Sequence, residues 1–249
     1  MLQVQHLSVN YRHLQALKDV GFDLPDGALV GLIGPNGAGK STLIKALLGL
    51  LPVTQGRVLY QGELLKRQRQ RVAYVPQRSQ IDWDYPITVW GVVMMARTTH
   101  AGWLRSYSRQ SQAIVKEALE RVELLPLRDR PIGALSGGQQ QRVFLARAIA
   151  QQADLLLLDE PLAAVDKKTE ALIFQIYDEL KAQGKTLLIS CHEWGGILDH
   201  YDQLLLLNQR LIAHGAPKEV MTQQNIQTAY GIPPQLPHFH DSLESNFFC

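Results

Sequence analysis

Residues 34–42 combine glycines, one lysine and two hydroxyl side chains at the spacing G-x-x-x-x-G-K-[ST]. Glycines let the backbone curl so that successive N–H groups face one centre, which forms a binding site for phosphate oxygens. The lysine of this pattern is expected to reach the β- and γ-phosphates of a nucleotide, and the first hydroxyl is expected to hold Mg²⁺. The predicted phosphate-binding residues are Gly34, Pro35, Asn36, Gly37, Ala38, Gly39, Lys40, Ser41 and Thr42.

The segments on either side of this loop have the character that the motif requires. Residues 28–33 are an apolar run typical of a buried strand, and residues 43–48 have the pattern of a helix. Strand, glycine-rich loop and helix in this order are the context of a phosphate-binding loop, or P-loop. The complete motif in this context disfavours the alternative, a glycine-rich turn that binds nothing. A P-loop alone does not separate kinases, GTPases, helicases and transport ATPases.

A second glycine-rich segment, L-S-G-G-Q at residues 135–139, narrows the choice. With this motif the chain resembles the nucleotide-binding subunits of ABC transporters, whose signature is LSGGQ. The resemblance implies that the segment caps the γ-phosphate of ATP held by the P-loop of a partner subunit, where a helix N-terminus favours an anion. The residues with this expected role are Ser136, Gly137, Gly138 and Gln139. The alternative is an ordinary helix cap at Ser136.

Two carboxylates follow a run of four leucines at residues 155–158. The run is typical of a strand buried on both faces, so Asp159 is expected at the carboxyl end of a parallel strand, where α/β sheets bind ligands. The family resemblance makes Asp159 a residue that supports Mg²⁺ and makes Glu160 the general base for the attacking water. The alternative is a pair of solvated carboxylates at a strand end.

Four single residues also match positions of the family. The resemblance implies that Gln77 meets Mg²⁺ and the attacking water, that Asp166 lies in the loop crossing the dimer interface, and that His192 contacts the γ-phosphate. Tyr11 is expected to stack on adenine, although a cross-strand aromatic in an early hairpin is the alternative. ATP is the expected nucleotide, and the sequence itself does not exclude GTP.

The segment after Gln77 carries the information on substrate. Residues 76–79 read Pro-Gln-Arg-Ser and residues 82–86 read Asp-Trp-Asp-Tyr-Pro. These elements resemble the family's subgroup for manganese, zinc and iron uptake, with manganese as the first choice. We expect Trp83 and Asp84 to form an exposed anchor for a permease helix. The alternative is that the aromatics only pack.

The resemblance also implies the partners. They are a second copy in a head-to-tail, ATP-bridged homodimer, an integral membrane permease and, indirectly, an extracytoplasmic metal-binding receptor. The expected location is the cytoplasmic face of the cell membrane, because no stretch of eighteen apolar residues and no secretory signal occur in the sequence. The net charge is only +2 and the sequence has no long basic run, so no nucleic-acid partner is expected.

The predicted fold is an α/β P-loop NTPase core sheet with a small antiparallel β lobe and an inserted helical subdomain at about residues 88–135. The ATP-binding domain is expected to span residues 1–232, which are long enough to bury a full core. Residues 233–249 lack periodicity and are expected to form a flexible tail, whose His238, His240 and Asp241 could hold a metal.

Two rival functions come from other classes. A soluble ABC ATPase acting on DNA or ribosomes predicts duplicated cassettes, zinc-ligand insertions or a long coiled coil, and the sequence has none of these. A non-catalytic nucleotide-binding regulator predicts a damaged Glu160 or His192, and both residues are intact.

Overall fold

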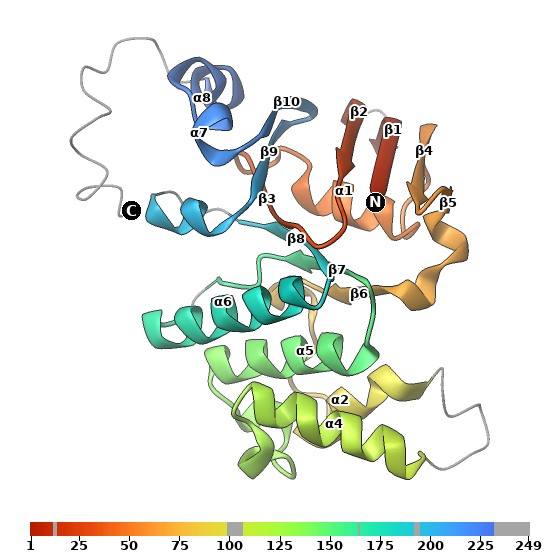
Figure 1. Ribbon diagram of the computed structural model, residues 1–249, viewed down its shortest axis with the longest axis vertical. Helices are drawn as coiled ribbons and strands as arrows, with labels where there is room; N and C mark the ends of the chain where they lie inside the picture. The colour runs from red at the N-terminus through yellow and green to blue at the C-terminus, as the bar shows by residue number, and fades with distance from the viewer. Residues whose placement is uncertain (12–13, 99–106, 164, 192–194, 232–249) are drawn as a thin grey trace.

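The computed structural model describes residues 1–11, 14–98, 107–163, 165–191 and 195–231, and Figure 1 shows their arrangement. The central element is a six-stranded sheet with the order β10-β9-β3-β8-β7-β6. Strands β9, β3, β8, β7 and β6 run parallel, and β10 pairs antiparallel with β9. Its strands are β3 (Leu29–Ile33), β6 (Val72–Val75), β7 (Leu155–Asp159), β8 (Thr186–Ser190), β9 (Gln203–Asn208) and β10 (Arg210–Gly215).

A second, antiparallel sheet has the order β2-β1-β4-β5. Its strands are β1 (Leu2–Tyr11), β2 (Leu14–Leu24), β4 (Gln55–Tyr60) and β5 (Glu63–Leu64). This sheet and helix α1 (Lys40–Leu47) lie in the same half of the molecule in Figure 1. The sheet corresponds to the small β lobe expected from the sequence.

The leucine-rich strands separate two apolar cores, because alternate side chains of a strand point to opposite faces. Leu157 and Leu188 pack in one core with α1 and the antiparallel sheet. Their neighbours Leu156 and Leu187 pack in the other core with the helices of the opposite face. Every residue of β3, β7 and β8 is buried, which explains why these strands read as continuous apolar runs.

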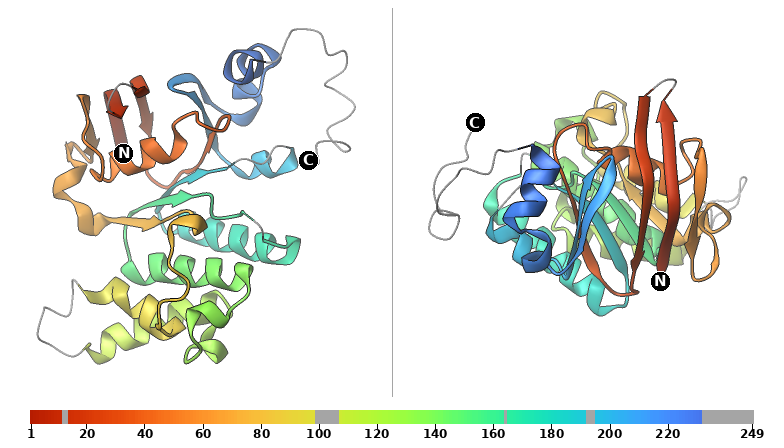
Figure 2. Two further views of the ribbon diagram at one scale, coloured as in Figure 1. Left: turned by 180° about the vertical axis from the view of Figure 1, so that it is seen from behind. Right: turned by 90° about the horizontal axis from the view of Figure 1, so that it is seen from above.

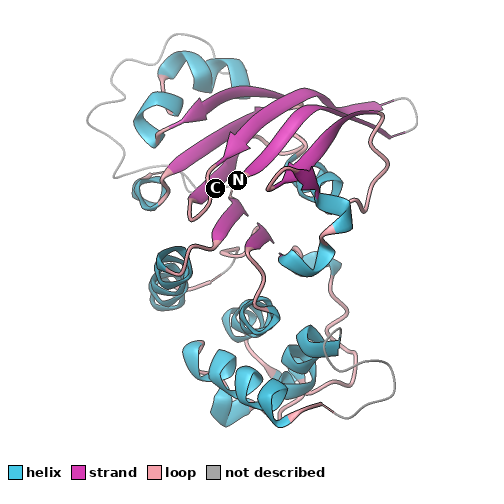
Figure 3. Ribbon diagram, turned by 45° about the vertical axis from the view of Figure 1, so that its right-hand side comes forward, coloured by secondary structure: helices cyan, strands magenta, loops and turns pink. Residues whose placement is uncertain are grey.

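The half of the molecule away from the antiparallel sheet consists mainly of helices, as Figure 3 shows. Short polar side chains cap four of them: Thr88, Ser108, Ser136 and Asp166 each accept a hydrogen bond from a backbone N–H three residues later. The helices are α2 (Val89–Met94), α4 (Arg109–Arg121), α5 (Gly137–Gln151) and α6 (Lys167–Ala182). Helices α2 and α4 lie within the insertion expected at about residues 88–135 and share one core with α5, and the domain boundaries remain a prediction.

Short 3₁₀ turns complete the connections between these elements. They lie at Leu65–Arg67, Arg69–Arg71, Arg78–Gln80, Met95–Arg97, Leu125–Leu127, Ile132–Ala134 and Gly196–His200. Within the part of the chain that the structure describes, no helix has the length and apolar character needed to span a membrane. The predicted tail, with His238, His240 and Asp241, lies outside the described residues.

The described chain ends with helices α7 (Pro217–Val220) and α8 (Gln223–Tyr230). In Figure 1 and in the view from above in Figure 2, the β9–β10 hairpin lies between these helices and strands β1 and β2. Gln209 at the hairpin turn donates its N–H to the carbonyl of Ala38 at 2.8 Å and accepts the N–H of Lys18 at 2.8 Å. The hairpin is therefore bonded to both the P-loop and the antiparallel sheet.

Two glycines of the P-loop are required by their surroundings. Gly34 has φ +153°, and a Cβ at this position would lie 2.0 Å from the carbonyl oxygen of Leu207. Gly39 has φ +96°, and a Cβ there would lie 2.9 Å from the carbonyl oxygen of Ala16. Backbone atoms cannot move aside as a flexible side chain can. These contacts therefore require glycine at both positions for packing, in addition to any role of the loop in binding phosphate.

We expect Gly34→Ala to lower the free energy of unfolding by about 3 kcal/mol or more, because it adds overpacking to a strained φ. The matched control is Gly37→Ala, whose φ is +79° but whose Cβ would meet nothing within 4 Å. Its cost should stay near the roughly 1–2 kcal/mol of a left-handed alanine. Thermal unfolding should place the Gly34→Ala midpoint lower by several degrees than the control. Equal midpoints would contradict this expectation, because they would show that the β9–β10 hairpin moves to accommodate the added Cβ at little cost.

Candidate functional site

A cavity of about 850 Å³ opens above the P-loop. It brings together segments that are far apart in the sequence: the P-loop, the β1–β2 region, Gln77, Glu160 and the C-terminal elements. Tyr11 lies on its wall with 43% of its surface exposed, at the end of the β1–β2 hairpin. The residues lining the cavity are Tyr11, Leu14, Gln15, Ala16, Gly34, Pro35, Asn36, Gly37, Ala38, Gly39, Lys40, Ser41, Thr42, Gln77, Glu160, Gln209 and Tyr230.

Lys40 is the first residue of α1, and its side chain is buried beneath the loop. Its Nζ donates to the carbonyl oxygens of Gly34 at 2.6 Å and Pro35 at 3.2 Å. Burial lowers the pKa of Lys40, while the negative charges of Glu160 and Asp159 act in the opposite direction. The lysine therefore places a desolvated ammonium where the loop and two carboxylates meet.

Asp159 connects three elements at the carboxyl end of β7. Its Oδ1 accepts the hydroxyl of Ser41 from α1 at 3.1 Å and the hydroxyl of Ser190 from β8 at 2.7 Å. The side chain is fully buried, and its Oδ2 has no hydrogen-bond partner among the residues that the structure describes. A buried carboxylate oxygen beside a hydroxyl is an oxygen donor set that suits Mg²⁺. Asp159 and Ser41 thus fit the metal expected with a nucleotide.

Glu160 stands next to Asp159 and projects into the cavity. Its carboxylate Oε2 accepts Nε2 of Gln77 at 2.6 Å, and its N–H donates to Ser190 Oγ at 2.9 Å. The backbone at Glu160 has φ +53°, a left-handed conformation that non-glycine residues adopt at a cost. Strain of this kind, held in place by two hydrogen bonds, is typical of functional positions. The structure therefore brings together two of the three predicted catalytic residues, and the third, His192, lies outside the described residues.

The signature segment begins helix α5. Ser136 Oγ accepts the N–H of Gln139 at 3.3 Å, and Gln139 Oε1 accepts the N–H of Ser136 at 3.0 Å, which makes a capping box. None of residues 136–139 is among the described residues that line the cavity. Ser136 therefore caps its own helix, and because it is exposed its loop is also accessible from outside, so the role toward a partner's ATP stays a prediction.

Asp166 is likewise exposed and lies away from the cavity wall formed by the described residues. It caps α6 through Oδ1, which accepts the N–H of Thr169 at 2.8 Å. This backbone hydrogen bond favours the ionised carboxylate and lowers the pKa of Asp166. None of the five residues predicted to contact a partner's ATP is therefore among the described residues that line the chain's own cavity.

Arg78, directly after Gln77, connects the cavity edge to the signature helix and was not anticipated from the sequence. Its Nη2 donates to Gln140 Oε1 at 3.1 Å, and a Cβ at Gly137 would lie 3.0 Å from its Nη1. Ser190 was also missed, although its place at the carboxyl end of the strand beside β7 is a signal that could have found it.

The expectation that the Trp83 ring is exposed is wrong, whereas its neighbour Asp84 is exposed as expected, and the anchor role of these residues stays a prediction. Its ring is partly buried, packs edge-on against Phe144 at 5.7 Å between centroids, and faces the guanidinium of Arg78 at 5.7 Å. Its Nε1 donates to the carbonyl oxygen of Arg78 at 3.2 Å. The exposed aromatic of this segment is Tyr85, with 61% of its surface accessible.

Comparison with known proteins agrees with this geometry. A family model described as ABC transporter matches residues 17–163. The zinc transport system ATP-binding protein TroB of Treponema pallidum is 47% identical over 92% of this chain and 86% of its own length. The manganese transport system ATP-binding protein MntB of Bacillus subtilis is 44% identical over 92% of each chain.

Solved structures point the same way. A nucleotide-free ATP-binding cassette from an ABC transporter has a TM-score of 0.77 and 26% identity, covering 94% of this chain and 96% of its own. The ATP-binding cassette MJ0796, solved as a dimer in a post-hydrolysis state with ADP and phosphate, has a TM-score of 0.77 and 25% identity over 87% and 98% of the two chains. The chain therefore belongs to the ABC transporter family and is an ATPase of its ATP-binding subunit type.

Proposed function

We propose that this chain powers the import of a divalent metal ion, with manganese as the first candidate and zinc as the second. Relatives named for manganese transport and for zinc transport are both more than 40% identical to it, so identity does not separate the two ions. The observation that carries the ATPase part of the proposal is the Gln77–Glu160 pair on the wall of the P-loop cavity. The metal ion is the cargo of the partner permease.

The cavity residues divide the work of hydrolysis. The P-loop N–H groups and Lys40 bind the phosphates, and Tyr11 stacks on the adenine. Ser41 and Asp159, with Gln77, would hold Mg²⁺, which would neutralise phosphate charge. Glu160 orients the attacking water and accepts its proton, while Gln77 holds the Glu160 carboxylate in position. His192 is proposed to contact the γ-phosphate.

The exposed signature loop leads us to propose a head-to-tail homodimer. Ser136, Gly137, Gly138, Gln139 and Asp166 would face the ATP held by the other copy, so each nucleotide bridges two subunits. Closure requires nucleotide, because it alone satisfies the N–H groups that face each other across the interface. Hydrolysis removes that bridge and shifts the equilibrium back to the open form, and this differential binding is what performs work.

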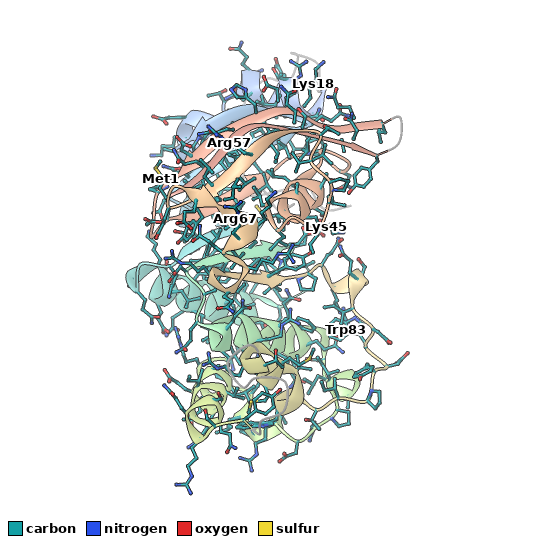
Figure 4. All side chains as sticks on the ribbon, turned by 90° about the vertical axis from the view of Figure 1, so that its right-hand side faces the viewer. Met1, Lys18, Lys45, Arg57, Arg67 and Trp83 are labelled. Carbon is teal, nitrogen blue, oxygen red and sulfur yellow. The ribbon has the colours of Figure 1, made fainter. Side chains whose placement is uncertain are left out.

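A surface between the two halves of the molecule suits the permease. An apolar cleft of about 210 Å³ at the end of α1 is bordered by Leu50, which is 60% exposed, and by Arg69. Figure 4 shows Lys45, Arg67 and Trp83 on one side of the molecule. We propose that a short permease helix with apolar and acidic residues docks here and beside Tyr85, on the cytoplasmic face of the membrane. The extracytoplasmic receptor would act only through the permease.

We expect Glu160→Gln to retain ATP binding, to lower hydrolysis by about 10²–10⁴-fold and to trap a dimer, because the nucleotide bridge is no longer cut. Phosphate release and size-exclusion chromatography with MgATP measure these effects. Glu117→Gln, which changes an exposed glutamate of α4, is the matched control and should behave as wild type. Hydrolysis by Glu160→Gln near the wild-type rate would remove Glu160 from this role.

We expect Gly137→Asp to preserve nucleotide affinity and to block dimer closure, because its carboxylate would repel the γ-phosphate held by the partner. Arg78 can move aside for the new side chain, since the close contact is with the far end of its guanidinium. Gly137→Ala tests for bulk without charge and should lose less activity. Mixing Gly137→Asp with Lys40→Ala subunits leaves one intact composite site per mixed dimer, so partial ATPase activity should return. A complete absence of recovery would contradict sharing between subunits.

We expect Tyr85→Ala to leave the basal ATPase of the isolated chain intact and to lower metal uptake by about tenfold or more, because the exposed ring is the stronger candidate for an interface anchor. Trp83→Ala should also lower thermal stability, since this ring is packed. The assay is uptake of labelled Mn²⁺, Zn²⁺ and Fe²⁺ in cells that lack the chain and carry each variant. If uptake of a sugar or amino acid depends on the chain while uptake of all three ions does not, the metal assignment is wrong.

A further inference from the structure

The wall of the nucleotide cavity includes two residues from the C-terminal elements. Gln209, at the turn of the β9–β10 hairpin, and Tyr230, the last residue of α8, both line it. No motif covers these positions, and the matched family region ends at residue 163. Their presence beside the P-loop raises the question of which part of the nucleotide they would meet.

The hydrogen bonds of Gln209 locate it along the cavity. Its backbone binds Ala38 of the P-loop on one side and Lys18 of β2 on the other, and Lys18 lies two residues after the cavity residue Ala16. The Gln77–Glu160 pair, which is hydrogen-bonded within the same cavity, is the proposed γ-phosphate end, where the attacking water is needed. The C-terminal elements therefore border the end shared by Tyr11 and the β1–β2 hairpin, which is the nucleoside end.

Helix α8 is held firmly enough to present a side chain there. Asn208, at the end of β9, donates Nδ2 to the carbonyl oxygen of Ala229 at 2.9 Å. Ile226 and Ala229 bury their side chains, and the ring of Tyr230 packs partly against the same core while it reaches the cavity. Gly231 ends the helix in a left-handed conformation with φ +68°. Figures 1 and 2 agree that α8 lies beside this hairpin.

We propose that Tyr230 contacts the nucleoside of the bound nucleotide and forms, with Tyr11, a second aromatic wall of the nucleoside site. An aromatic ring can stack on a purine, and its hydroxyl can hydrogen-bond a ribose. The inference rests on the proposed nucleotide site. It adds that the C-terminal helix is part of this site, so that nucleotide affinity depends on residues beyond the P-loop ATPase core.

The test measures calorimetric affinity of the full chain, with Mg²⁺ present, for ADP and for inorganic tripolyphosphate. ADP is not consumed, and tripolyphosphate lacks the nucleoside that Tyr230 would contact. We expect Tyr230→Ala to weaken the binding of ADP about tenfold, which is about 1.4 kcal/mol, and to leave the affinity for tripolyphosphate unchanged. Tyr230→Leu, which keeps apolar bulk against the core, should weaken ADP binding to a similar extent. Tyr230→Phe should lose less of the affinity for ADP.

Two controls make the result decisive. Thr228→Ala changes an exposed residue of the same helix and should bind both probes as wild type does. Lys40→Ala should weaken both probes, and if it weakens neither, the proposed phosphate site itself is wrong. Unchanged ADP affinity in Tyr230→Ala and Tyr230→Leu would overturn the nucleoside contact. An equal loss for ADP and tripolyphosphate in both variants would also overturn it, because that result would mean that the ring only supports the fold.

Discussion

The buried carboxylate of Asp159 is the interaction on which the site depends. A charge removed from water is costly unless other groups satisfy it. Here hydroxyls from α1 and β8 bind one oxygen, and the second oxygen has no hydrogen-bond partner among the described residues, which suits a cation. This requirement brings the start of α1 and the ends of β7 and β8 to one point. The same point receives Lys40 and the strained Glu160, so the sheet, the loop and the Gln77–Glu160 pair are positioned by a single cluster.

Close backbone packing fixes the other side of the P-loop. Gly34 lies directly against the carbonyl of Leu207, and Gln209 donates to Ala38, so the β9–β10 hairpin supports the loop from behind. A nucleotide-binding loop that pays no further ordering cost when phosphate arrives binds more tightly than a mobile one. The β9–β10 hairpin thus supports the P-loop through backbone contacts, which depend little on side-chain identity.

Much of this arrangement could be predicted from the sequence because it is local. The leucine run before Asp159 predicts a buried strand and the glycine spacing before Lys40 predicts a loop that leads into a helix, and both predicted elements agree with the structure. Contacts between distant segments could not be predicted in this way. Arg71, which precedes β6, pairs at 2.8 Å with Asp154, which precedes β7 and is 83 residues away in the sequence. The exposure of Trp83 was misjudged for the same reason, since a loop without periodicity does not reveal which of its aromatics meets Phe144.

The central claim is that two copies of this chain share each ATP, with hydrolytic groups from one and the signature loop from the other. The most direct test is a crystal structure of the Glu160→Gln chain with MgATP. The account predicts a two-fold dimer in which the γ-phosphate lies between Lys40 of one copy and Ser136 of the other, with Mg²⁺ on Ser41 and Asp159. ATP bound by one copy alone, with Ser136 facing solvent in a closed dimer, would contradict it.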